Sequence, residues 1–189
     1  PRSARTLAEP ARDAGFQTAA FVAAVVLDRA FGLDQGFETY AGPTGSGAGE
    51  SYEVASLPAR AVIDSALAWL GTRDRARPFF LWIHLFDPHQ PYAPPPEFAL
   101  ADPYLGEVAS MDHELGRLFE HLDANGLSSS TAILVVADHG EALGQHGEDT
   151  HGVLCYEPTL HVPFLLVRPD GARAGERSRA EVSVIDVAP

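Results

Sequence analysis

The 189 residues are enough for one substantial domain or for part of a larger one, and 46% hydrophobic with 21% charged residues is the composition of a globular chain. All 13 basic residues are arginine and the formal net charge is −13, which argues against a nucleic-acid backbone or an anionic membrane surface as partner. No apolar run reaches the roughly 18 residues that a membrane-spanning helix needs.

The first predicted element is a helix over residues 3–14, which ends at Gly15. The run TAAFVA, residues 18–23, has the character of a short strand. Residues 42–50, GPTGSGAGE, are predicted to form a loop, and they lack the Gly-Lys-Ser/Thr ending of a phosphate-binding loop.

A second helix is predicted from Ser56 to Leu70, because apolar residues recur there at helical spacing. Ser56 is its expected N-cap, with Pro58 in the first turn. The run PFFLWIHLF, residues 78–86, is a fully apolar strand of the buried type. It stops at DPHQPYAPPPEF, whose prolines forbid both a helix and a central strand.

A long amphipathic helix is predicted over residues 105–124, and two more buried strands over 131–138 and 162–169. This alternation predicts an α/β fold with a mostly parallel central sheet sandwiched by helices. In such sheets the site lies off the carboxyl ends of the strands. Two loops that contain both histidine and acid, 87–92 and 138–151, each follow an apolar strand directly, so we expect the site there.

The stretch VVADHGEALGQHGEDTHG holds the first group of candidate site residues. A carboxylate and an imidazole at a strand end, Asp138 and His139, can reach one cation, and Gly140 lets the backbone turn away. The alternative is a helix N-cap for Asp138 and a surface position for His139. His151, twelve residues beyond His139, can join only if the loop folds back. His146, flanked by glycines, could equally bond the loop to itself.

The stretch WIHLFDPHQPYAPP holds the second group. His89 lies past the strand end between two prolines, which stiffen its placement, and Asp87 could orient it or cap the turn. His84 lies inside the apolar run, where a histidine bonded within the core is the default interpretation. Tyr92 could line the mouth of a site or simply pack.

A cation with several imidazoles, and no basic side chain among them, suits attack on a tetrahedral anionic ester. The metal would neutralise the non-bridging oxygens while a histidine protonates the leaving oxygen. Such a cation would also explain how a chain of net charge −13 attracts an anionic substrate.

In order, and over nearly the whole chain, these motifs resemble the sulfatase family of the alkaline-phosphatase superfamily. The matching segments are TLAEPARDAGFQTAAFV, GLDQGFETY, PFFLWIHLFDPHQPYAPP, ADHGEALGQHGEDTHG, HVPFLLVRP and VSVIDVAP. The resemblance implies an alkaline-phosphatase/sulfatase-like α/β fold, incomplete here, in which residues 1–189 form one partial catalytic domain.

The resemblance also implies a divalent cation, typically calcium, held partly by Asp138 and His139. It implies that His89, in the DPHxPY position, touches the sulfate or the leaving group. The position of His151 is often a lysine in sulfatases, where it contacts the sulfate. The expected catalytic residues are therefore His89 and His151, and the expected partner is a small-molecule or glycan sulfate ester.

Family members carry a formylglycine nucleophile, made from Cys or Ser in a C/S-x-P-x-R motif, in a segment that would precede this chain. The run SLPAR, Ser56 to Arg60, fits that motif letter for letter, but it follows the segments that ought to come after the nucleophile. We therefore interpret it as a helix start, and expect the chain to be inactive without the upstream segment. Cys155 does not match the motif and is expected to be a packed thiol.

Three functions stay open. The preferred one is hydrolysis of sulfate esters by the protein that contains this chain. The second is a phosphodiesterase or phosphoglycerol-type transferase of the same superfamily, with two metals and a Thr or Ser nucleophile. The third is a non-catalytic domain that binds an anion or a partner. The sequence does not predict the ester, the identity of the metal or the oligomeric state.

Overall fold

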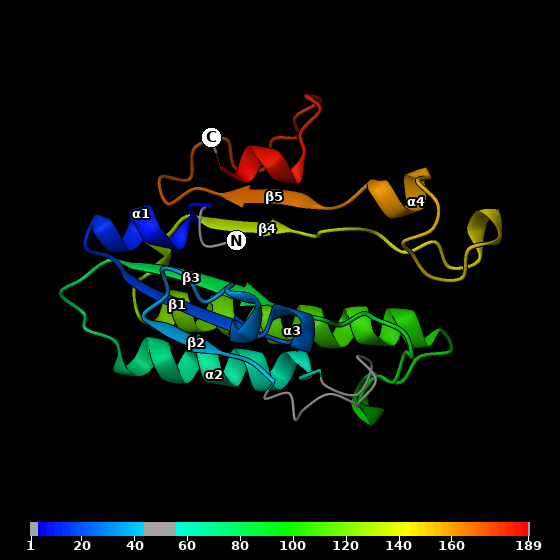
Figure 1. Ribbon diagram of the computed structural model, residues 1–189, viewed down its shortest axis with the longest axis horizontal. Coiled ribbons are helices and arrows are strands. Elements are labelled where there is room, and N and C mark those ends of the chain that lie inside the picture. The colour runs from blue at the N-terminus through cyan, green and yellow to red at the C-terminus, as the bar shows by residue number, and fades with distance from the viewer. Residues whose placement is uncertain (1–3, 44–55, 189) are drawn as a thin grey trace. The chain divides into compact units, whose positions relative to one another are not determined.

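The computed structural model describes residues 4–43 and 56–188, and the chain forms two compact units, Pro1–His121 and Leu122–Pro189 (Figure 1). Most of the predicted loop over 42–50, and the first residue of the predicted helix over 3–14, lie outside the described residues. No helix of the described part is both long and apolar enough to cross a membrane.

The first unit is built on a parallel sheet. Its strands are β1 (Gln17–Val22), β2 (Thr39–Ala41) and β3 (Phe79–His84), in the order β2-β1-β3. Every residue of the central strand β1 is buried, as expected of a parallel strand with neighbours on both edges and both faces. The predicted strands over 18–23 and 78–86 and their parallel pairing are confirmed.

Alternate residues of β1 face two different cores, as the period of a strand requires. Ala19 and Phe21, with Ala23 just after the strand, form one core with Val62 and Ala66 of α2 (Ala59–Thr72), which runs along one face of the sheet (Figure 1). On the other face Ala20 and Val22 meet an aromatic cluster, whose members are Phe37, Tyr40 and Trp82. The small side chains of β1 allow both layers to approach closely.

The two helices that flank β1 in sequence both begin later than predicted. The first, α1 (Ala8–Asp13), starts within the predicted range and ends before Gly15, whose φ of +88° confirms the expected stop. The second, α2, begins at Ala59, with Pro58 at the N-cap position. Ser56 is exposed and forms a bridge with Ala24, so its predicted role as N-cap is wrong.

The long helix α3 (Pro103–Ala124) matches the predicted range, and Gly126 at φ +66° follows its end. Its buried residues with side chains recur at helical spacing and are Glu107, Ser110, Glu114, Leu118 and Leu122. Glu114 joins α3 to α2, because its carboxylate accepts from Arg60 Nε at 3.1 Å and also from Arg117. The predicted apolar stripe is therefore interrupted by two buried acids.

In the second unit the strands β4 (Ile133–Val136) and β5 (Phe164–Val167) pair antiparallel, with Leu134 opposite Leu166. Both strands were predicted, with longer bounds, but the expectation of a mostly parallel sheet does not extend to this pair. A parallel return needs a crossover helix packed on the sheet. The segment between these strands instead folds into a long loop, a 3-10 turn at Gln145–Gly147 and the four-residue helix α4 (Glu157–Leu160).

Short 3-10 helices complete the described chain, at Val25–Leu27, Arg29–Phe31, Pro96–Phe98, Ser128–Ser130 and Val184–Val187. Asp28 caps the second of them by accepting from Ala30 N at 2.7 Å. Ser183 and Asp186 form a reciprocal capping box at the last.

Candidate functional site

The loop after β3 contains Asp87, which joins this loop to α2. Its Oδ2 accepts from Ala59 N at 2.8 Å, and so satisfies one of the backbone N–H groups that a helix N-terminus leaves without an intrahelical partner. Burial raises the pKa of Asp87, against the opposing effect of this bond. The sequence suggested that Asp87 orients His89 or caps the turn, whereas the contact found here is with the N-terminus of α2.

Glu107 of α3 holds the same loop from the other side, and sequence reasoning missed it. Its Oε2 accepts from His89 N at 3.0 Å, and its Oε1 accepts from Ala93 N at 2.6 Å. The residue is 5% exposed. Burial raises the pKa of Glu107, although both amide bonds and the His89 ring act in the opposite direction.

The imidazole of His89 is placed by its own loop. The ring stacks on Phe86 with centroids 4.1 Å apart and planes 20° apart. Its Nδ1 lies 2.6 Å from Gln90 O, and because a carbonyl oxygen only accepts, Nδ1 carries the proton in this contact. His84, at the end of β3, is bonded within the core as expected, since its Nδ1 accepts from Ala23 N at 3.4 Å. Tyr92 packs edge-on against Tyr104 at 5.5 Å.

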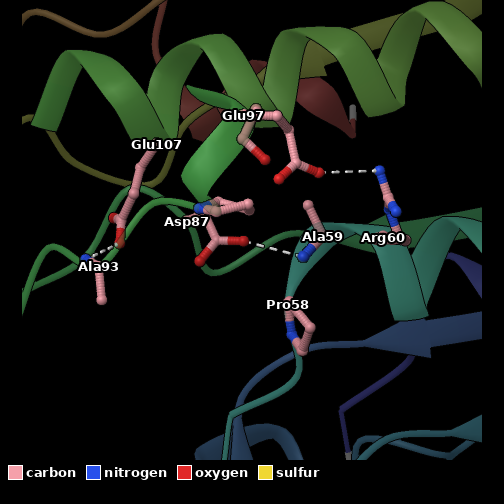
Figure 2. A pocket seen from close by; sticks show the side chains of 9 residues that line it. Pro58, Ala59, Arg60, Asp87, Ala93, Glu97 and Glu107 are labelled. Atoms are coloured by element: carbon pink, nitrogen blue, oxygen red, sulfur yellow. Dashed lines mark hydrogen bonds and ion pairs between the residues drawn. The ribbon is translucent and has the colours of Figure 1, made fainter. Parts of the chain in front are cut away.

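A cavity of about 220 Å³ lies beside this loop. Figure 2 shows three carboxylates around it, from Asp87, Glu97 and Glu107, with the N-terminus of α2 on the opposite side. Each carboxylate has a partner: Asp87 and Glu107 accept from backbone amides, and Glu97 lies 3.6 Å from Arg60. The carboxylates of Asp87 and Glu107 in the cavity wall are therefore already used to hold the backbone around it.

The loop after β4 brings three of the predicted site residues together. The rings of His139 and His151 stack with centroids 3.9 Å apart, so the loop does fold back across the eleven residues between them. Asp138 Oδ2 lies 3.8 Å from His139 Nε2, and Asp138 Oδ1 accepts from His139 N at 3.0 Å. His151 Nδ1 lies 3.2 Å from an oxygen of Glu141, whose side chain is 6% exposed.

A buried glutamate also organises this second loop. Glu148, 7% exposed, accepts from Val153 N at 2.8 Å and from Leu154 N at 3.1 Å. His146 stacks on Tyr156 with centroids 3.9 Å apart, which favours the structural alternative left open for that histidine. Cys155 is exposed, so the expectation of a packed thiol is wrong.

Gly140 is required by close packing. A Cβ at this position would lie 2.0 Å from the carbonyl oxygen of Pro158, and Gly140 N donates to Thr159 O at 2.9 Å. The sequence suggested that Gly140 frees the backbone for a sharp turn. The close approach of the segment around α4 gives the stronger reason.

A cation at this loop would meet one carboxylate and one imidazole. The side chains of Asp138 and His139 are 80% and 43% exposed, so both can be reached by an ion. Hard divalent cations accept the carboxylate oxygen, and an imidazole nitrogen is a common ligand of divalent metals. Within the part of the chain that the structure describes, no group of three or more His, Cys, Asp and Glu side chains is arranged to hold a metal, so this pair would supply only part of a coordination shell.

Comparison with known proteins gives a consistent result. The family model described as Sulfatase matches residues 1–189. An arylsulfatase of Clostridium perfringens is 25% identical over 179 residues, which cover 72% of this chain and 37% of the relative. A steryl-sulfatase of Mus musculus is 32% identical over 145 residues, which cover 69% of this chain and 23% of the relative. The chain thus spans well under half the length of these relatives.

The fold comparison agrees. The structure of BT4656 in complex with its substrate D-glucosamine-2-N,6-O-disulfate superposes on 88% of this chain, and on 56% of its own, with a TM-score of 0.72 and 16% sequence identity. At this identity the likeness establishes the shared fold, which is the fold expected from the sequence.

Proposed function

This chain belongs to the sulfatase family, and from that premise we propose that it carries part of the active site of a sulfuric ester hydrolase. The observation that supports this most is the match of the family to all 189 residues. The curated relatives include an arylsulfatase and a steryl-sulfatase. The substrate we propose is a small-molecule or glycan sulfate ester.

Asp138 and His139 are the residues that we propose as ligands of a divalent cation, with calcium as the expected ion. When bound, such an ion would neutralise charge on the sulfate oxygens. The donor types and the exposure of both side chains support this assignment. The remaining ligands would come from residues outside this pair.

His151 and His89 are proposed to bind the anionic ester and to move a proton at the leaving oxygen. The contact between His151 Nδ1 and Glu141 supports this role, because a carboxylate partner fixes the tautomer and orientation of an imidazole. The bond from His89 Nδ1 to Gln90 O fixes the other ring in the same way. In both rings Nδ1 carries a proton that is used in these contacts. Nε2 is therefore the nitrogen that can transfer a proton to or from the ester.

The nucleophile is proposed to be a formylglycine in a segment that precedes this chain in the complete protein. Ser56, the first residue of the one S-x-P-x-R sequence in the chain, is exposed and forms a bridge with Ala24, three positions before α2 begins. Its place in this bridge, just before the helix, supports a structural role.

The test uses the protein expressed from its complete gene, with four single variants: Asp138→Asn, His139→Ala, His89→Ala and His151→Ala. We expect the first two to lower the bound calcium measured by mass spectrometry, and the last two to lower kcat on a chromogenic aryl sulfate by about 10²–10⁴-fold. His161→Ala is the matched control, since His161 contacts Glu157 on the surface.

Turnover of a phosphodiester of the same phenol is measured in parallel. A preference for the phosphodiester, or unchanged turnover after replacement of either His89 or His151, would contradict the proposal. Unchanged calcium content in the Asp138 and His139 variants would contradict the assignment of the metal ligands.

A further inference from the structure

The loop Asp87–Pro95, DPHQPYAPP, has very few backbone groups by which the protein can hold it. Four of its nine residues are proline, which has no N–H to donate. The remaining five amides belong to Asp87, His89, Gln90, Tyr92 and Ala93. Whatever fixes this loop must therefore use those few donors.

Glu107 takes two of them. Its two oxygens accept separately, one from His89 N at 3.0 Å and one from Ala93 N at 2.6 Å, so a single side chain bridges the loop on both sides of Pro91. Only a carboxylate can do this without rearrangement, because a glutamine side chain offers one acceptor oxygen and its NH₂ group would face the other N–H.

This contact carries an energetic cost that packing alone does not explain. Glu107 is 5% exposed, and none of the ion pairs formed between described residues includes it. Burial of a carboxylate without a paired cation is unfavourable, and here the nearby Asp87 carboxylate adds to the cost. An apolar side chain at this position on α3 would leave His89 N and Ala93 N without this acceptor, so the contribution of the carboxylate lies in the loop that it holds.

The group held is the backbone of His89 itself. The imidazole of His89 is further placed by Phe86 and by the carbonyl of Gln90, its neighbours along the chain. Both contacts depend on the backbone conformation at His89. The bond from His89 N to Glu107 thus connects α3 to the direction of the ring.

We propose that Glu107 is a positioning residue for His89, which holds the imidazole in the orientation needed for proton transfer at the leaving oxygen. This inference rests on the proposed function of His89. Glu107 acts through the backbone of the loop and is assigned no contact with the ester.

The test compares Glu107→Gln with Glu120→Gln in the complete protein. Glu120 is exposed on the same helix, so the control makes the same chemical change away from the loop. We expect Glu107→Gln to lower kcat by about 10–100-fold, with KM changed by less than about threefold, because displacement of a catalytic group by about 1 Å has effects of that size. The loss of kcat should grow as the pKa of the leaving phenol rises, because a poorer leaving group depends more on proton transfer. His89→Ala should show the same trend.

A double-mutant cycle separates positioning from general destabilisation. If Glu107 acts through His89, Glu107→Gln should change kcat by less than about twofold in the His89→Ala background. An equal loss in both backgrounds, or a loss independent of the leaving group, would overturn the inference and leave the proposed function standing. Full turnover by His89→Ala would instead overturn the proposed role of His89, and the inference with it.

Ala93→Pro tests the same contact from the donor side, because it removes the N–H that Glu107 Oε1 accepts and keeps the carboxylate. It replaces Glu107→Gln in the cycle if that variant folds poorly. We expect the same dependence on the leaving group and the same loss of effect in the His89→Ala background. Effects of Ala93→Pro that persist without His89 would count against the inference.

Discussion

Buried acids at single positions determine the shape of both candidate site loops. Asp87 and Glu107 hold the loop after β3, and Glu148 holds the loop after β4, in each case by accepting from backbone N–H groups. Such bonds to ionised acceptors are about twice as strong as those between neutral groups. They compensate for the scarcity of regular secondary structure in segments rich in proline and glycine.

Asp87 gives a prediction about pH. Burial raises the pKa of Asp87 in the folded chain, so between its ordinary and its raised pKa the folded state binds more protons than the unfolded state. The free energy of unfolding must then fall as the pH rises through that window. Asp87→Asn keeps an oxygen that can accept from Ala59 N but cannot ionise, so we expect its stability to fall less over the same range.

Urea unfolding of the wild type and Asp87→Asn at a series of pH values measures this difference. The raised pKa of Glu107 contributes with the same sign and persists in the variant, so the slope should decrease without vanishing. A wild-type stability that rises relative to the variant as the pH increases would show that the Asp87 carboxylate is favoured by the fold.

At the scale of elements, periodicity predicted the strands and helices but not what holds their ends. The predicted strand over 78–86 contains β3, and the predicted helix over 105–124 matches α3 closely. Both were predicted well because a continuous apolar run and an apolar stripe at helical spacing are strong patterns. The start of α2 was misplaced because its cap is Asp87, 28 positions along the chain, whereas a capping rule reads only adjacent residues. The antiparallel pairing of β4 with β5 was missed, although the sequence has no helical pattern between these strands that could form the crossover of a parallel pair.

The candidate site was predictable to a similar degree. The histidines and Asp138 stand out because such side chains are dense after apolar strands. Glu107 gave one weak signal, an acid at the same helical spacing as Glu114 and Leu118. An isolated acid in a helix is more often exposed, so only tertiary structure shows that this one is buried under a loop.

Glu114 gives a prediction at the scale of elements, since it joins two helices. Its side chain is 1% exposed and accepts from Arg60 of α2 and Arg117 of α3, and Arg117 also bonds Asp64 at 2.6 Å. Glu114→Ala should lower the free energy of unfolding by about 2–3 kcal/mol, because bonds between charged groups are lost in a buried position. The arginines are exposed enough to be hydrated in the variant, so the loss should not reach the larger values seen when a buried charge is left alone.

Urea unfolding of Glu114→Ala measures this loss, with Glu120→Ala as the control on the same helix. An exposed substitution of that kind should change stability by less than about 0.5 kcal/mol. Equal effects of the two variants would mean that the helices α2 and α3 do not depend on the buried carboxylate.

At the scale of the whole molecule, the cation site that we propose at Asp138 and His139 needs more ligands than the described residues supply there. A calcium ion takes about 6–8 oxygen ligands, whereas Asp138 and His139 are one carboxylate and one imidazole. The arylsulfatase and steryl-sulfatase relatives are much longer, with 37% and 23% of their lengths matched by this chain. Both observations lead us to expect that binding of the cation and turnover depend on the complete protein.

The corresponding prediction compares the 189-residue chain with the protein expressed from its complete gene. On a chromogenic aryl sulfate with added calcium, the chain should be slower on the order of 10³-fold or more, because loss of a nucleophile alone has an effect of that size. Calorimetric titration should show weaker calcium binding by the chain, since each missing carboxylate removes both a ligand and a negative charge that attracts the ion.

Circular dichroism of the chain must show folded α/β structure for the comparison to count. Equal turnover by a folded chain would mean that these 189 residues contain a nucleophile and enough ligands by themselves, and would direct attention back to Ser56.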